Sequence, residues 1–240
     1  MPKGKSKATG AAAGTAPPTT SASPAPNWPS LKTGIPPDSL FINTLLHDQI
    51  LIIRNLLSAK LCKDYVAFLS SLPLTTTPGT PKRGEAVRVN DRFQIQDVKF
   101  AQLLWEQTAL EHLVRGYEEQ TVWRGEVLGL NPNIRVYRYK PGQFFDQHYD
   151  ESNKVTFGPS RTPGKTTWTL LIYLTTCEGG ETAFYPEPAR KGQRAPDPII
   201  VGLETGMALL HNHDDCMLHE GREVVRGEKW VLRSDLVVRR

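Results

Sequence analysis

The second half of the chain consists of short β-type runs separated by glycine and proline, and this pattern constrains the fold more than any other feature of the sequence. The runs cover residues 134–139, 167–174, 198–203, 208–211 and 230–238. Short strands separated by turn residues are typical of two sheets folded into one barrel. We therefore expect a mainly β protein with flanking helices (α+β), whose barrel core, about 123–240, is a double-stranded β-helix of the jelly-roll type.

The first half of the chain predicts elements that support this barrel. Residues 49–54 form an apolar run typical of a buried strand, and Ser58 is placed to cap a helix that begins after it. Apolar side chains recurring at helical spacing predict a second helix over residues 98–113. We expect N-terminal supporting helices within about 38–122, in one domain of residues 38–240.

Residues 1–30 have a different composition, mostly Ala, Pro, Ser, Thr, Gly and Lys. Such a segment buries too little apolar surface to offset the entropy of ordering, so we expect a disordered low-complexity tail. Lys3, Lys5 and Lys7 are expected to be part of that solvated tail, with a weak nuclear or organelle address as the alternative.

Composition also limits the partners. The formal net charge of +4 is spread along the chain, so nucleic-acid binding is not expected. No apolar run reaches the roughly 18 residues of a membrane span, and no signal-peptide core follows the N-terminal lysines. Three cysteines without a CxxC spacing favour reduced thiols and an intracellular location, cytoplasmic or nuclear.

His148 and Asp150 are candidate metal ligands. On a strand, residues i and i+2 point to the same side, roughly 7 Å apart, so both side chains can reach one ion while Tyr149 faces away. Two histidines and one carboxylate occupy one face of an octahedral metal and favour non-haem Fe(II). The third ligand in this interpretation is His219.

Spacing alone leaves a second metal site open. His213 and Asp215 repeat the His-x-Asp spacing, and His211 with His213 forms a His-x-His pair. A site built from His211, His213 and His219 is therefore equally compatible with the spacing.

Three segments of the chain carry a family resemblance. They are RVYRY (135–139) leading to PGQ and HYDES (148–152); TLLIYL (169–174) followed by GGET; and GMALLHNH (206–213) followed by HEG and GEKW (227–230). In these segments the chain resembles the prolyl 4-hydroxylase-like branch of the Fe(II)/2-oxoglutarate dioxygenases, over roughly residues 38–240. The resemblance implies that His148, Asp150 and His219 bind iron, and that Lys229, ten positions after the last ligand, holds 2-oxoglutarate.

The residues around Lys229 support that role, because a lysine on an apolar strand entering the core needs an anionic partner. Arg233 is the alternative anchor, although the spacing matches Lys229. Tyr139 and Thr169 match family positions that help to hold the same carboxylate.

The remaining histidines are expected to have other roles. His213 is predicted to order a turn or to hydrogen-bond near the site rather than to bind iron. His47 and His112 lie in the predicted supporting segment and are excluded as ligands.

The sequence says less about the substrate. The loops at 75–84 and 151–165 are expected near the entrance, the first as a lid. Asn90 and Arg92, within RVNDRF (88–93), are candidates for substrate contact, with capping or bracing of the barrel as the alternative.

The implied function is a non-haem Fe(II)- and 2-oxoglutarate-dependent dioxygenase that hydroxylates a C–H bond. Its cosubstrates would be 2-oxoglutarate and O2, its co-products succinate and CO2, and ascorbate is a candidate reductant. The substrate is a protein side chain, with proline as one candidate, or a small molecule. The alternatives are a cupin-like metalloenzyme that uses Mn, Ni or Zn without 2-oxoglutarate, and a non-catalytic barrel that binds a partner.

Overall fold

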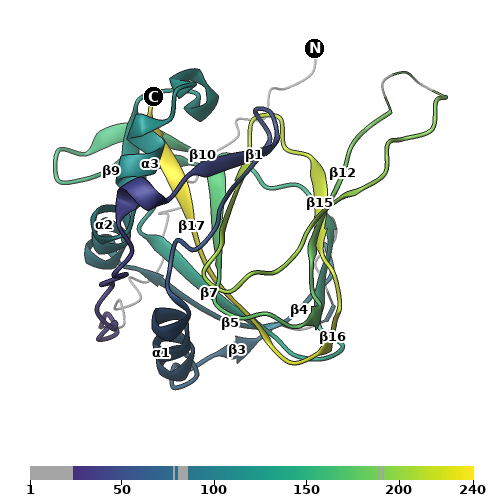
Figure 1. Ribbon diagram of the computed structural model, residues 1–240, viewed down its shortest axis with the longest axis horizontal. Coiled ribbons are helices and arrows are strands. Elements are labelled where there is room, and N and C mark those ends of the chain that lie inside the picture. Colours follow the sequence, from purple (N-terminus) through teal and green to yellow (C-terminus); the bar gives the residue numbers. More distant parts are fainter. Residues whose placement is uncertain (1–23, 78, 81–85, 189, 191) are drawn as a thin grey trace, which may run out of the picture.

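Two antiparallel sheets face each other as a barrel, with helices along the outside of the larger sheet (Figure 1). The computed structural model describes residues 24–77, 79–80, 86–188, 190 and 192–240. The predicted double-stranded β-helix with flanking helices is confirmed. Most of the predicted tail, including its three lysines, lies outside the described residues.

The larger sheet has the strand order β1-β2-β14-β10-β17-β7-β5-β3, with β6 also paired to β17 and β9 to β10. Its strands are β1 (Ile42–Leu46), β2 (Ile50–Ile53), β3 (Thr75–Thr76), β5 (Asp91–Gln96), β6 (Val127–Leu130), β7 (Asn133–Tyr139), β9 (Lys154–Phe157), β10 (Thr162–Tyr173), β14 (Ala208–Asn212) and β17 (Lys229–Arg239). Strands from both halves of the sequence therefore share one sheet.

The smaller sheet has the order β13-β12-β15-β8-β4, and β11 pairs separately with β16. The strands are β4 (Arg88–Val89), β8 (Phe144–His148), β11 (Glu178–Gly179), β12 (Thr182–Tyr185), β13 (Ile199–Val201), β15 (Leu218–Gly221) and β16 (Val224–Arg226). In Figure 1 the labelled strands β4, β12 and β15 lie on the side opposite the helices. The space between the two sheets is the barrel interior.

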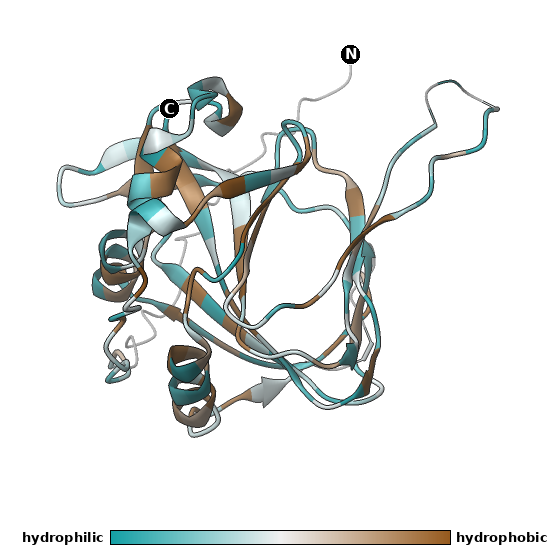
Figure 2. Ribbon diagram, in the orientation of Figure 1, coloured by the Kyte–Doolittle hydropathy of each residue, from teal (hydrophilic) through white to brown (hydrophobic). Residues whose placement is uncertain are grey.

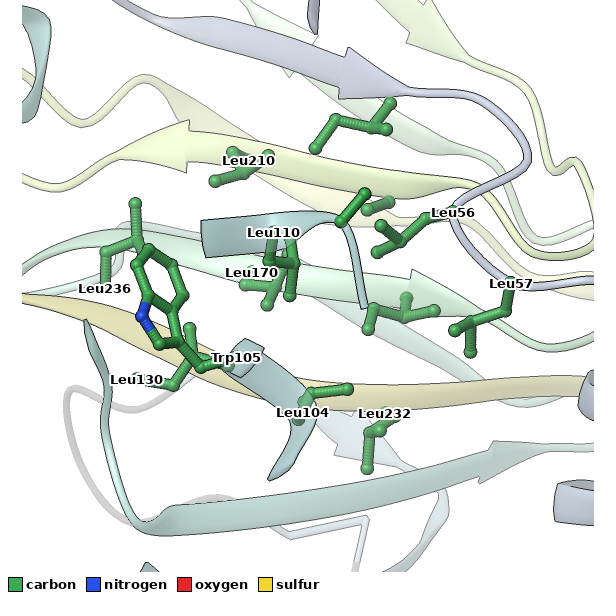
Figure 3. Packing of buried hydrophobic residues seen from close by; sticks show 14 of the residues in the cluster. Leu56, Leu57, Leu104, Trp105, Leu110, Leu130, Leu170, Leu210, Leu232 and Leu236 are labelled. Atoms are coloured by element: carbon green, nitrogen blue, oxygen red, sulfur yellow. The ribbon is translucent and has the colours of Figure 1, made fainter. Parts of the chain in front are cut away.

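Side chains alternate along β10 and β17 between two apolar cores. Leu170 and Leu232 point outward to a core shared with the helices, where Figure 3 shows them packed beside Leu104. Tyr173 and Val231 point inward to a smaller core inside the barrel. Because successive strand residues face opposite sides, one sheet serves both cores. Figure 2 shows brown, hydrophobic stretches along β17.

The helices are α1 (Ala59–Leu69), α2 (Val98–Gln107) and α3 (Leu110–Gly116), with short 3-10 turns at η1 (Pro37–Ser39) and η2 (Gln120–Trp123). The Ser58 hydroxyl accepts from the backbone N–H of Leu61 at 3.3 Å, which confirms the predicted cap of the first helix. No helix within the described residues is both long and apolar enough to cross a membrane.

The prediction of one continuous helix over 98–113 was wrong. The backbone leaves the helical conformation at Thr108, where φ is −100° and ψ is 178°. The Thr108 hydroxyl donates to the Leu104 carbonyl at 2.7 Å and accepts from the Leu110 N–H at 3.2 Å. A side chain thus replaces backbone hydrogen bonds at the break, which apolar spacing alone does not reveal.

Two predictions about segments stay predictions. The first is that the domain has the limits 38–240. Within it, the segment 38–122 supplies strands as well as helices. The lid is the other, because residues 78 and 81–85 of that loop lie outside the described residues.

Candidate metal centre and cosubstrate cavity

Strand register brings the two histidine ligands together. His219 on β15 lies directly opposite His148 on β8, and their ring centroids are 4.2 Å apart. Asp150 follows the end of β8 by two residues, with its Oδ1 3.9 Å from His148 Nε2. One donor atom from each of the three residues lies within 4.8 Å of the others. The structure therefore assembles the predicted set of ligands.

Backbone carbonyls fix which nitrogen of each imidazole faces the site. His148 Nδ1 lies 2.7 Å from the Asp146 carbonyl, and His219 Nδ1 lies 2.9 Å from the Met217 carbonyl. A carbonyl only accepts, so each Nδ1 carries the hydrogen and each Nε2 keeps its lone pair for a metal. The ring of Phe145 stacks on His148 at 3.5 Å and limits its rotation.

Electrostatics keep these ligands in their metal-binding forms. Burial and the neighbouring His219 lower the pKa of His148 to about 3, and burial lowers the pKa of His219 as well. Burial alone would raise the pKa of Asp150, but Arg233 and the surrounding imidazoles hold it well below its ordinary value. At neutral pH the site presents neutral imidazoles and an ionised carboxylate.

Lys229 lies deeper in the barrel, opposite Tyr139 in the pairing of β17 with β7. It is 4% exposed, and its Nζ donates to the Gly180 carbonyl at 2.7 Å. Burial lowers its pKa to about 8. None of the ion pairs among the described residues includes Lys229, so its ammonium is available for an anion from outside the protein.

One cavity of about 40 Å³ connects these groups. The predicted iron ligands and the predicted cosubstrate anchors line the same space: His148, Asp150, His219, Tyr139 and Lys229. Burial raises the pKa of Tyr139 above its ordinary range, so its hydroxyl stays a neutral donor.

The other predicted contacts lie elsewhere. Thr169 is outside the cavity lining and donates to Asp150 Oδ2 at 2.6 Å, so nothing here supports its predicted contact with 2-oxoglutarate. Asn90 is fully buried and hydrogen-bonded to Thr77, and Arg92 contacts Gln94; neither lines the cavity. Their role in substrate binding stays a prediction, and their contacts favour bracing.

The alternative site of three histidines is not assembled. His213 Nε2 faces the Thr169 hydroxyl at 2.8 Å, as expected for a residue that hydrogen-bonds near the site. His211 does approach the centre, with its ring 4.5 Å from that of His219. It lines the cavity on the same inward face of β14 as Leu209, although the sequence placed it only in the alternative site of three histidines.

Comparison with known proteins agrees with this geometry. Residues 134–234 match the model of the 2OG-Fe(II) oxygenase superfamily. This segment contains all six residues that the sequence predicts to bind the metal or the cosubstrate. This match, together with the curated relatives named below, confirms the resemblance of the chain to the prolyl 4-hydroxylase-like 2OG-Fe(II) oxygenases.

Curated relatives include two from Arabidopsis thaliana. The chain is 32% identical to prolyl 4-hydroxylase 13 over 111 residues, 41% of this chain and 40% of the relative. It is 28% identical to prolyl 4-hydroxylase 2 over 163 residues, 59% of this chain and 53% of the relative. The chain thus spans about half the length of the curated relatives it matches.

Solved structures show the same fold. The viral collagen prolyl hydroxylase of Paramecium bursaria Chlorella virus-1 superposes with a TM-score of 0.52 at 18% identity, covering 79% of this chain and 96% of that one. A Pseudomonas putida prolyl-4-hydroxylase gives 0.51 at 16% identity, covering 80% and 94%.

The family's cofactors fit the residues present. The family uses Fe(II) and 2-oxoglutarate. Two neutral imidazoles and a carboxylate match the donor set of non-haem iron. The buried ammonium of Lys229, which has no carboxylate partner in the part of the chain that the structure describes, matches a carboxylate of the cosubstrate.

Proposed function

We propose that this protein is an Fe(II)- and 2-oxoglutarate-dependent hydroxylase. The observation that carries the proposal is the single cavity that holds three convergent metal ligands and a buried lysine without a carboxylate partner among the described residues. When bound, Fe(II) with 2-oxoglutarate and O2 supplies oxidation of a C–H bond to C–OH, with succinate and CO2 as co-products.

The chain's own residues hold and orient these groups. His148, Asp150 and His219 would hold the metal on one face, which leaves the other positions for the cosubstrates. Lys229 and Tyr139 would hold the distal carboxylate of 2-oxoglutarate by charge and hydrogen bond. The apolar rings that line the cavity exclude water.

We propose a protein or peptide substrate, with prolyl side chains as the first class to test. The support is the naming of the curated relatives as prolyl 4-hydroxylases, each matched over part of its length. An intracellular location stays a prediction from the sequence.

The test is turnover of 2-oxoglutarate to succinate by the purified protein with Fe(II), read by NMR, together with a 16 Da mass gain in proline-containing peptides. The His148→Ala variant is the matched control and should produce no succinate. Succinate without peptide modification would redirect the search to other protein side chains or small molecules. No iron-dependent succinate under any condition contradicts the proposal and favours a metalloenzyme of another kind or a binding module.

A further inference from the structure

The two carboxylate oxygens of Asp150 have different surroundings. Oδ2 accepts from the Thr169 hydroxyl at 2.6 Å and lies 2.8 Å from Arg233 Nη2. Oδ2 also lies 3.5 Å from His211 Nε2, whereas Oδ1 lies 3.9 Å from Nε2 of the ligand His148. The protein therefore distinguishes the two oxygens before any metal binds.

The Thr169 hydroxyl uses all of its hydrogen-bonding positions within the protein. A hydroxyl has one donor and two acceptor positions. Arg233 Nη2 donates to Thr169 Oγ1 at 3.1 Å, and His213 Nε2 lies 2.8 Å from the same atom. With the hydroxyl proton directed to Asp150, His213 Nε2 is the donor in the remaining contact. All three positions are used, so Thr169 has no capacity left for 2-oxoglutarate.

Arg233 also lies close to a second carboxylate, that of Asp235. Its Nη2 lies 3.5 Å from Asp235 Oδ1, and Asp235 also pairs with Arg135. The register of the larger sheet sets these neighbours, since Asp235 lies opposite Thr169 and Arg233 lies opposite Arg135. A row of alternating charges from Arg135 on β7 through Asp235 and Arg233 on β17 thus ends at Asp150, with the neutral Thr169 of β10 beside it.

This row matters because Asp150 is not on a regular strand. β8 ends at His148, so the aspartate ligand lies in the connection that follows, whereas both histidine ligands lie on paired strands. The smaller sheet places the histidines, and the larger sheet places the carboxylate through contacts to one of its oxygens.

We propose that Thr169 and Arg233 are positioning residues that hold Oδ2 of Asp150 and leave only Oδ1 to coordinate the metal. The inference rests on the metal site of the proposed function. A carboxylate free to bind through both oxygens would occupy one more metal position, at the expense of the cosubstrates. Supporting residues of this kind typically change metal affinity about 10- to 100-fold.

The experiment compares two buried threonines on β10. Thr169→Val removes the donor to Asp150, whereas Thr167→Val removes a hydrogen bond of 3.1 Å to the Trp123 carbonyl, away from the site. Both threonines are fully buried, so the second variant controls for the cost of losing a buried hydrogen bond. Thr169→Ser keeps the hydroxyl.

Binding of Co²⁺ to the purified proteins is measured by calorimetry, with the visible absorption spectrum of bound Co²⁺ as the second readout. We expect Thr169→Val to weaken Co²⁺ binding about 10-fold or more and to alter the spectrum. Thr169→Ser should restore both, and Thr167→Val should match the wild type in both. Arg233→Lys, which keeps the charge but loses the planar fork, should also weaken binding and provides an independent test if the valine variant does not fold.

Wild-type affinity and an unchanged spectrum in Thr169→Val overturn the inference, as does an equal loss in Thr167→Val. A wild-type protein that binds neither Co²⁺ nor Fe²⁺ overturns the proposed function itself. The two failures are therefore distinguishable.

Discussion

Two cations lie four residues apart on the inner side of β17, Lys229 buried and Arg233 largely buried, and their surroundings are opposite. Arg233 lies within 3.5 Å of carboxylate oxygens from Asp150 and Asp235. Lys229 donates to a backbone carbonyl and forms no ion pair among the described residues. Burial alone would lower both pKa values; the two carboxylates instead raise that of Arg233, while that of Lys229 falls to about 8.

The difference separates structural from ligand-binding charge. Carboxylates of the protein neutralise the Arg233 guanidinium, so this cation needs no anion from outside the folded chain. The ammonium carries an electrostatic cost that only an incoming anion removes. Charge and burial are similar in the two residues, and the neighbouring carboxylates decide their roles.

The largest expected effect is on stability, from Arg233→Met. Removing this partner leaves the carboxylate of Asp150 without a cation, which typically costs about 3–5 kcal/mol. Denaturant unfolding of the metal-free protein would measure the change in the free energy of unfolding. A loss below about 1 kcal/mol would contradict the view that this cation holds the larger sheet together.

The matching substitution at the other cation, Lys229→Met, should act on the ligand instead. The free energy of unfolding should stay constant or rise, because a buried unpaired charge is removed. The affinity for 2-oxoglutarate should fall about 100-fold, about 2.7 kcal/mol, as expected for a lost partner of a buried charge pair. Calorimetric titration with 2-oxoglutarate in the presence of Mn²⁺ measures this, and Co²⁺ affinity without cosubstrate serves as the control. Unchanged 2-oxoglutarate affinity would remove Lys229 as the anchor.

A smaller effect is expected from pH. With the pKa of Lys229 at about 8, the ammonium is charged below this pH and binds the carboxylate directly. Above it the protein must take up a proton to bind, so the affinity for 2-oxoglutarate should fall by up to about tenfold per pH unit. Titrations between pH 7 and 9.5 test this.

Lys229→Arg is the matched control for the pH series, because a guanidinium stays charged over this range. If it binds at all, its affinity should not decline in parallel with that of the wild type. A parallel decline would assign the pH dependence to another group.

The sequence was sufficient to predict the barrel and most of the residues in the cavity. The β-type runs predict the barrel, and the motif spacing identifies His148, Asp150, His219 and Lys229, which the structure places in one cavity. Residues of this kind are recognisable because their order along the chain is tied to their chemistry.

The role of Arg233 could not be predicted from the sequence. It lies four positions after Lys229 and therefore on the same side of β17, which made it an alternative anchor by pattern alone. Its contact with Asp150 joins residues 83 positions apart and depends on where the connection after β8 lies. The same holds for Thr169, which a family position assigned to the cosubstrate and which contacts the aspartate ligand instead.

The smallest expected effect comes from an exposed cation, which shows whether burial is what makes Arg233 important. Arg54 Nε lies 3.0 Å from Glu204 Oε1, a distance similar to that of the buried pair, but the two side chains are 50% and 48% exposed. Water already solvates both charges, so Arg54→Gln should change the free energy of unfolding by less than about 1 kcal/mol. The same denaturant series measures it. If Arg54→Gln lowers the free energy of unfolding as much as Arg233→Met does, contact distance rather than burial sets the contribution of these cations to stability. The distinction between Arg233 and Lys229 would then have to rest on ligand binding alone.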